Sequence, residues 1–311
     1  MYNHARHTAQ LAWQFQGANE RYIMTAQLLV FGPGYSAQPI IKQAQENGWK
    51  VSATYRNDET RQQQINTNIN PIAFNGENLP NISAESPLHL LVTIAPKQTG
   101  DPTLNIWETC LRQQNNIASI NYLSSTNVYG DHQGNWVNET TLPTPNLDRG
   151  KFRLQAEQRW QSLTIEKGAR LFIYRLAGIY GPDRNAFKAL KAGRARCIIK
   201  ENQIFSRIHV EDIRQTVWCA MNSNHKGGIF NLADNEPSAP HEVIEAAAKI
   251  MGCNAPKREQ WDTAELSEMA RSFYLESKRV CNTKIKQELG VELLFPNYKR
   301  GLEALLKTDG Y

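Results

Sequence analysis

A short apolar run followed by a glycine turn and a helix is the feature that most constrains this chain. Gln27–Phe31 predicts a buried strand, residues 32–37 a tight turn, and residues 39–47 a helix that ends at Gly48. Trp49–Tyr55 predicts a second strand. A strand that leads through such a turn into a helix directs backbone amides and the positive end of the helix dipole at one point. The segment therefore predicts an anion site.

The spacing of small residues in this turn fits the fingerprint of dinucleotide binding, Gly-x-Gly-x-x-Gly/Ala. Gly32 allows the turn, Gly34 lets the backbone approach a phosphate, and Ala37 lets the helix pack on the strand. Tyr35 lies between them in the same turn. We therefore predict that Gly32, Gly34, Tyr35 and Ala37 bind the pyrophosphate of a pyridine dinucleotide.

The end of the second strand bears on which dinucleotide binds. An NAD-specific site would place a carboxylate there to accept the ribose 2′-hydroxyl, whereas this chain has Arg56. An arginine can pair with a 2′-phosphate, which favours NADP as the cofactor. The alternative is a solvated Arg56 with Asp58 or Glu59 accepting the ribose, and the cofactor would then be NAD.

Composition and charge exclude several classes of protein. Of the 311 residues, 41% are apolar and 21% charged, as in ordinary globular proteins. The net charge of +5 is dispersed among acidic residues, which argues against a nucleic-acid partner. The five cysteines form no Cys-x-x-Cys pair, so we expect neither disulfides nor a metal site. No apolar segment is long enough to span a membrane, and we expect a cytoplasmic protein.

The chain divides into three parts by pattern. Residues 1–23 are rich in glutamine and asparagine, and we expect them to be a poorly ordered N-terminal extension. Residues 24–178 predict the NAD(P)-binding domain, with residues 205–235 returning to its sheet. Residues 179–204 and 236–311 predict a small substrate-binding cap.

Strands and helices alternate along the first of these domains. Further strands are expected at residues 71–74, 88–93, 117–123, 170–176 and 228–232, and helices at 104–115, 150–166, 239–251 and 282–289. Strands separated by helices imply right-handed crossovers. The predicted fold class is therefore α/β, with a doubly wound parallel sheet of the Rossmann type.

Ligands of such sheets bind beyond the carboxyl ends of the strands. Thr93 and Ala95 follow the fourth predicted strand, and Ala177 and Gly178 follow the sixth. We predict that these four residues contact the cofactor. Tyr180 leaves the sixth strand toward the same crevice and is predicted to face the substrate.

Four motifs occur in an order that is more specific than any one of them. They are Ser124–Gly130, Arg149–Glu157, Arg175 with Ile179–Pro182, and Ile208–Asp212. In this order they resemble the extended short-chain dehydrogenase/reductase superfamily, of the NAD-dependent epimerase/dehydratase type, from about Ala26 to about Leu306. The resemblance implies NAD(P) as cofactor, a small-molecule substrate, and a homodimer formed through helices flanking the sheet, including the one from Gly150.

The catalytic residues that the resemblance implies are only partly present. Members of the family use a tyrosine as acid/base, a lysine four residues later, and a serine or threonine that binds the reacting oxygen. Ser125 matches the hydroxyl position, but Arg149 stands at the tyrosine position and Arg153 at the lysine position. A guanidinium stays protonated, so Arg149 cannot be the acid/base. Arg153 keeps the charge and can hold ribose hydroxyls or an anionic group of the ligand.

Three residues are candidates to replace the missing tyrosine. Tyr129 follows Ser125 by four residues on the same exit loop, Tyr180 leaves the sixth strand, and His209 lies in a short apolar run. Each also has a structural alternative, because tyrosines beside glycine usually pack with a satisfied hydroxyl and a histidine in an apolar run usually lies in the core. We favour Tyr129 among the three.

The substrate side predicts an anionic ligand. Family members that act on nucleotide sugars often have an arginine three residues before the Ile-His-Val segment, but Phe205 is there and Arg207 lies two residues on. That difference argues against recognition of a diphosphate. Four arginines form a predicted anion-binding cap: Arg184, Arg194, Arg196 and Arg207. The run 269–274 is expected to close the site.

The residues together indicate an NAD(P)-dependent oxidoreductase or epimerase-like enzyme that acts on a small, polar, anionic metabolite. A protein that binds NAD(P) without turnover, as a redox sensor or partner-binding module, is the alternative. Replacement of both the tyrosine and the lysine favours that alternative. A third hypothesis is a structural paralogue that has lost the cofactor as well.

Overall fold

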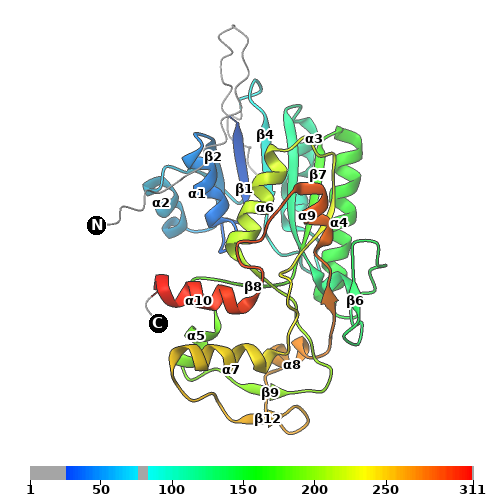
Figure 1. The fold of residues 1–311 in the computed structure, drawn as a ribbon. Helices are drawn as coiled ribbons and strands as arrows, with labels where there is room; N and C mark the ends of the chain where they lie inside the picture. Colours follow the sequence, from blue (N-terminus) through cyan, green and yellow to red (C-terminus); the bar gives the residue numbers. More distant parts are fainter. Residues whose placement is uncertain (1–25, 76–82, 310–311) are drawn as a thin grey trace, which may run out of the picture.

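The computed structural model describes residues 26–75 and 83–309, so the predicted extension 1–23 lies outside the described residues. Within them, a seven-stranded parallel sheet runs in the order β3-β2-β1-β4-β5-β7-β11 (Figure 1). Its strands are β1 (Gln27–Phe31), β2 (Lys50–Tyr55), β3 (Asn70–Ala73), β4 (Leu88–Val92), β5 (Ile117–Ser125), β7 (Arg170–Leu176) and β11 (Gly227–Leu232). The order reverses between β1 and β4, which confirms the predicted doubly wound sheet.

Helices cover both faces of this sheet. The helices of one face are α1 (Gln38–Glu46), α6 (Val210–Asn222) and α9 (Thr283–Leu289), and those of the other are α3 (Pro102–Gln113) and α4 (Asp148–Lys167). A further helix, α2 (Asp58–Asn66), lies against β2 and β3 at the sheet edge. It was not predicted from the sequence.

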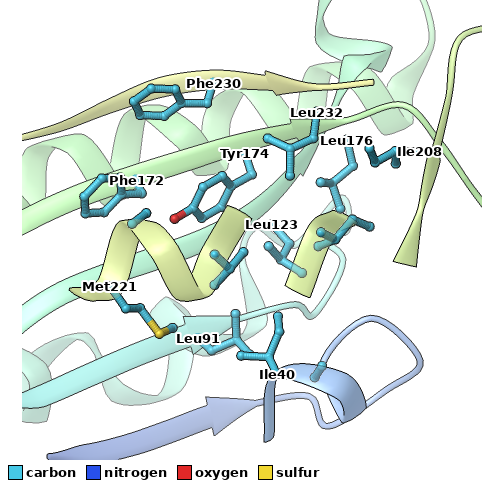
Figure 2. Close-up of a cluster of buried hydrophobic side chains, with 14 of the residues drawn as sticks. Ile40, Leu91, Leu123, Phe172, Tyr174, Leu176, Ile208, Met221, Phe230 and Leu232 are labelled. Atoms are coloured by element: carbon cyan, nitrogen blue, oxygen red, sulfur yellow. The ribbon is translucent and has the colours of Figure 1, made fainter. Parts of the chain in front are cut away.

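The two faces have separate hydrophobic cores. On the first face, Leu91, Phe172 and Phe230 from the strands pack toward Ile40 of α1 and Met221 of α6, as Figure 2 shows. On the second face, two tryptophans from α3 and α4, Trp107 and Trp160, are fully buried against the strands. Aromatic side chains of this size bury much apolar area, so the two helix layers are fixed firmly to the sheet.

A smaller unit lies beyond the carboxyl ends of the strands and forms the lower part of Figure 1. Its elements are β8 (Gly178–Tyr180), α5 (Ala186–Lys191), β9 (Cys197–Ile199), β10 (Arg207–His209), α7 (Pro240–Met251), β12 (Arg258–Gln260), α8 (Glu268–Phe273) and α10 (Tyr298–Asp309). Strand β13 (Arg279–Val280) pairs with β6 (Trp136–Val137) and links the cap to the loop after β5.

The cap has its own core, assembled from two stretches of the chain. Tyr180 and Phe187 come from the first stretch, and Ala247, Tyr298 and Leu302 come from the second. Between the stretches the chain passes through α6 and β11 of the larger domain. Of residues 205–235, which were predicted to return to the sheet, β11 does so, but β10 pairs only with β8 in a separate two-stranded sheet.

None of the helices formed by the described residues is both long and apolar enough to cross a bilayer.

Candidate functional site

Gly32 forms the turn at the end of β1 and is tightly enclosed. Its φ of 88° lies in the left-handed region, and a Cβ atom added there would lie 2.7 Å from the Ile94 side chain. The Gly32 amide donates to the Thr54 hydroxyl at 3.0 Å, and the Thr93 hydroxyl donates to the Gly32 carbonyl. Because β2 and β4 both hold this turn, its geometry is fixed by the sheet rather than by the loop.

The turn continues into α1 with open space above it. A Cβ atom added at Gly34 would meet nothing within 4 Å. The amides of Ala37 and Gln38 donate to the Gly34 carbonyl, and Ala37 is fully buried under the start of α1. The N-terminus of a helix also carries a partial positive charge. The open space at Gly34 and the helix start therefore fit a pyrophosphate group.

A cavity of about 590 Å³ extends from this turn to the cap. Most of the predicted site residues line it: Gly34, Tyr35, Thr93, Ser125, Arg149, Arg153, Ala177, Gly178, Tyr180, Arg184 and Arg207. Gly32 and Ala37 lie beneath the turn and shape it. Ala95 is exposed and does not line the cavity, so the structure does not place it with the other predicted cofactor residues.

A second cavity of about 520 Å³ lies at the ends of β2 and β3. Arg56, Phe74 and Lys97 line it, and the Arg56 guanidinium lies 4.8 Å from the centre of the Phe74 ring. Asp58 and Glu59 are exposed in the first turn of α2 and do not line it. In such a sheet the adenosine end of a dinucleotide lies at the end of the second strand, and both charged side chains among the described lining residues of this cavity are cationic.

Ser125 and Arg153 meet at the end of β5. The Ser125 hydroxyl caps the short 3₁₀ helix η1 (Thr126–Tyr129) by accepting the Asn127 amide at 3.2 Å. The Arg153 guanidinium donates to the Leu123 carbonyl at 2.8 Å. Both side chains line the larger cavity, so a hydroxyl and a fixed cation face the same space.

Arg149 is held by the cap. Its guanidinium donates to the Ser272 hydroxyl at 2.8 Å and to the Ser272 carbonyl at 3.1 Å, and it lies 4.7 Å from the centre of the Phe273 ring. Its Nε atom is buried and has no partner within the described part of the chain. Arg149, which the sequence predicts at the position of the family's tyrosine, therefore connects α4 to α8, the helix formed by most of the run 269–274.

Tyr129, the favoured substitute for the missing tyrosine, does not lie in the cavity. Its side chain is fully buried, its hydroxyl donates to Asn231 at 2.8 Å, and its ring lies 4.8 Å from the Arg175 guanidinium. Burial raises the pKa of the phenol above its ordinary value. The turn of η1 directs this residue into the core, so the structure does not bring Tyr129 to the cavity, as a substitute for the catalytic tyrosine would require.

The other two substitutes have structural roles. The Tyr180 ring lines the cavity, but its hydroxyl packs on Gly301 of α10, and burial raises its pKa. His209 is buried at the start of α6, where Nδ1 accepts the Glu211 amide at 3.2 Å. Burial lowers the pKa of His209 to about 4, so its ring is neutral near pH 7.

Two ionisable residues of the cavity were not found from the sequence. Glu276 and Lys278 lie just before β13, are only 5% and 7% exposed, and line the cavity. The Lys278 ammonium donates to Glu276 at 2.8 Å and to the Gly130 carbonyl at 2.6 Å. No motif marks them in the sequence, because contacts with distant segments bring them to the site, among them the pairing of β13 with β6.

The charge of the cavity is strongly unbalanced. Five cations line it: Arg149, Arg153, Arg184, Arg207 and Lys278. Glu276 is the one carboxylate that we find among its described lining residues. Two of the four arginines predicted to form the anion-binding cap, Arg194 and Arg196, do not line the cavity. Arg196 pairs instead with Glu259. The described residues contain no cluster of three or more histidine, cysteine or carboxylate side chains that could hold a metal.

Comparison with known proteins indicates the family of this chain. The pattern of the NAD dependent epimerase/dehydratase family matches residues 97–233. A conserved protein of unknown function from Silicibacter pomeroyi is 41% identical, with a TM-score of 0.84 over 92% of this chain and 100% of that one. The chain belongs to the NAD-dependent epimerase/dehydratase family. This family is part of the extended short-chain dehydrogenase/reductase superfamily.

Two more distant relatives extend the comparison. Protein YeeZ of Escherichia coli K12 is 22% identical over 280 residues, which are 86% of this chain and 96% of that protein. The human epimerase family protein SDR39U1, solved with NADPH, has a TM-score of 0.69 at 14% identity, over 91% of this chain and 99% of that one. At this identity the second likeness shows a shared fold. The family and its fold are those of NAD(P)-binding proteins.

Proposed function

We propose that this family member is an NAD(P)-dependent oxidoreductase or epimerase-like enzyme that acts on a small, polar, anionic metabolite. The observation that carries the proposal is the larger cavity, which joins the glycine turn, the Ser125 hydroxyl and five cationic side chains in one space of about 590 Å³. That volume is typical of small-ligand sites. Its excess of positive charge favours a substrate with a carboxylate or phosphate group.

Each group of residues has a role in this proposal. The turn at Gly34 and the start of α1 would hold the pyrophosphate of a bound dinucleotide, which supplies or accepts a hydride. The Ser125 hydroxyl would donate a hydrogen bond to the reacting oxygen of the substrate. Arg153, fixed by the Leu123 carbonyl, would hold the nicotinamide ribose or an anionic group of the substrate.

The second cavity supports NADP over NAD. Arg56 and Lys97 line the space where the adenosine ribose would lie, and neither Asp58 nor Glu59 lines it. A 2′-phosphate would be held there by two cations. NADH would lack that partner and would bind more weakly.

A protein that binds NAD(P) without turnover is the second candidate. The attachment of Arg149 to Ser272 and the burial of Tyr129 favour it, because neither residue can donate and recover a proton at the cavity. Such a protein would bind the cofactor tightly, and the bound cofactor would control its binding to a partner protein.

One experiment separates the two candidates. NADPH is titrated into the purified protein, and its oxidation is followed with a panel of small anionic carbonyl compounds. We expect binding and turnover with at least one compound, and a loss of turnover of about 100-fold or more in Ser125→Ala. Ser162→Ala, on the exposed side of α4, is the matched control and should be fully active. Tight binding without turnover across the panel would support the sensor instead.

A further inference from the structure

The cap segment that carries Glu276 and Lys278 is held rigidly against the cavity. The Ser277 amide donates to Asp131 at 2.7 Å, and the Ser277 hydroxyl donates to the Asn202 carbonyl at 2.7 Å. The Gln203 side chain donates to the Glu276 carbonyl at 2.8 Å. Side chains on such a fixed segment are pre-organised, as acid/base groups must be.

The hydrogen bonds of Lys278 fix two of its three proton positions. Its nitrogen donates to Glu276 Oε2 at 2.8 Å and to the Gly130 carbonyl at 2.6 Å. An ammonium carries three N–H groups, whereas a neutral amine carries two and a lone pair. Both hydrogen bonds can therefore persist when the third proton leaves, and the side chain lies on the cavity wall.

Lys278 lies in the same cavity as the predicted catalytic positions Ser125 and Arg149. Gly130 ends the exit loop that begins with Ser125, so the Lys278 nitrogen is fixed to the loop of the predicted oxygen-binding hydroxyl. Arg149, at the position of the family's tyrosine, is near enough for its charge to act on Lys278. The structure thus puts a titratable amine on the wall of the cavity that Ser125 and Arg149 also line.

We propose that Lys278 is the catalytic acid/base of this protein and that Glu276 is its positioning residue. The proposal rests on the proposed oxidoreductase function. In the reducing direction, a bound dinucleotide would supply the hydride to the substrate carbon, and the Lys278 ammonium would give its third proton to the carbonyl oxygen. The product is an alcohol, and the resulting neutral amine recovers a proton from water. In the oxidising direction the amine takes the hydroxyl proton as the hydride leaves.

The charges around Lys278 determine its readiness to release the proton. Burial lowers its pKa, and the nearby Arg149 cation lowers it further. Glu276 and Asp131 act in the opposite direction, since their negative charges favour the ammonium. The pKa lies below the ordinary lysine value on balance, so Lys278 exchanges its proton more readily than a solvated lysine does. Oε1 of Glu276 is buried and lacks a hydrogen-bond partner in the structure described, which leaves an acceptor for a bound ligand.

The first test needs no substrate and no cofactor. Protein labelled with ¹³C-lysine is titrated by NMR, and the Lys278 signal is identified by its absence in Lys278→Met. We expect Lys278 to titrate below the ordinary lysine range and Lys299, paired with Glu236 on the surface, above it. Glu276→Gln should lower the Lys278 midpoint further. A Lys278 midpoint at or above the ordinary range, or no change in Glu276→Gln, would overturn the proposal.

The second test uses turnover of NADPH with a carbonyl substrate. Lys278→Met should lose at least about 100-fold in turnover, the usual share of general acid/base catalysis, while its Kd for NADPH stays within about twofold. Lys278→Arg keeps the charge but cannot release a proton to the substrate, because a guanidinium stays protonated, and its turnover should fall as far as that of Lys278→Met. Lys299→Met is the active control. Full activity in Lys278→Arg would show that only a cation is needed and would refute the acid/base role. If the wild-type protein does not bind NADPH at all, the proposed function is refuted. The NMR titration would still test the protonation behaviour of Lys278, because it needs no cofactor.

Discussion

Substitution by alanine should affect the protein differently at Gly32 and at Gly34, although both residues lie in one turn. Gly32→Ala should lower the free energy of unfolding, whereas Gly34→Ala should weaken NADPH binding. Alanine at Gly32 must adopt a φ of 88°, which costs about 1–2 kcal/mol, and its Cβ would lie 2.7 Å from Ile94 and 2.9 Å from Thr93. Overpacking of this kind adds about 1–3 kcal/mol. The free energy of unfolding should therefore fall by about 2–5 kcal/mol.

Gly34→Ala should leave the fold intact and damage the site. The added methyl group meets nothing within 4 Å, and Gly34 does not have a left-handed backbone. Its effect on stability should lie between zero and a gain of about 1 kcal/mol, since alanine restricts the unfolded chain. The methyl group would occupy the space proposed for the pyrophosphate, and we expect the Kd for NADPH to rise about tenfold or more.

Thermal unfolding without ligand and NADPH titration together measure both effects. At roughly 2 °C per kcal/mol for a chain of this size, Gly32→Ala should lower Tm by about 4–10 °C, whereas Gly34→Ala should leave Tm unchanged or slightly raised. Equal losses of Tm in the two variants would show that the turn is not held as the structure indicates. Unchanged NADPH binding in Gly34→Ala would refute the pyrophosphate site itself.

Two further predictions concern charge. Arg56→Ala should raise the Kd for NADPH about tenfold and leave that for NADH unchanged, because a charged hydrogen bond contributes about 1.5–3 kcal/mol; equal shifts for both nucleotides in parallel fluorescence titrations would count against the 2′-phosphate site. Asp234 is buried, and burial raises its pKa from 3.8 to about 7. The folded protein thus binds more protons than the unfolded chain between those values, so stability should fall as the pH rises through this window. Asp234→Asn removes this titration and should flatten the dependence of Tm on pH from 4 to 8; an unchanged slope would exclude Asp234 as its origin.

Elements specified by local pattern could be predicted from the sequence. The strand β1, the glycine turn and α1 follow from residues within one short segment, and the predicted boundaries lie within about one residue of those in the structure. The helix α2 was missed because it has almost no apolar stripe: the Ile65 side chain is 44% exposed. Its stability comes instead from the Asn57 cap, which accepts the Thr60 amide at 2.8 Å, and from Gln64, which donates to the Thr54 carbonyl.

The candidate site was less predictable, for two physical reasons. A strand's end tells which residues leave the sheet but not where a side chain points, and the 3₁₀ turn of η1 directs Tyr129 into the core. Lys278 and Glu276 reach the cavity through the pairing of β13 with β6, which joins segments about 140 residues apart in a two-residue ladder. A two-residue pairing between segments so far apart in the sequence produces no periodic pattern from which it could be predicted.

The cap is built from two separate stretches of the chain, and this determines how it can be exchanged between homologues. Tyr180 and Phe187 precede the last strand of the sheet in the chain, whereas Ala247, Tyr298 and Leu302 follow it, and all five share one hydrophobic cluster. A chimera that receives only one of these stretches from a homologue would join two halves that were never selected to fit each other. If the cap binds the substrate as proposed, transplanting substrate preference between relatives requires two simultaneous grafts, with the intervening helix and strand of the recipient left in place.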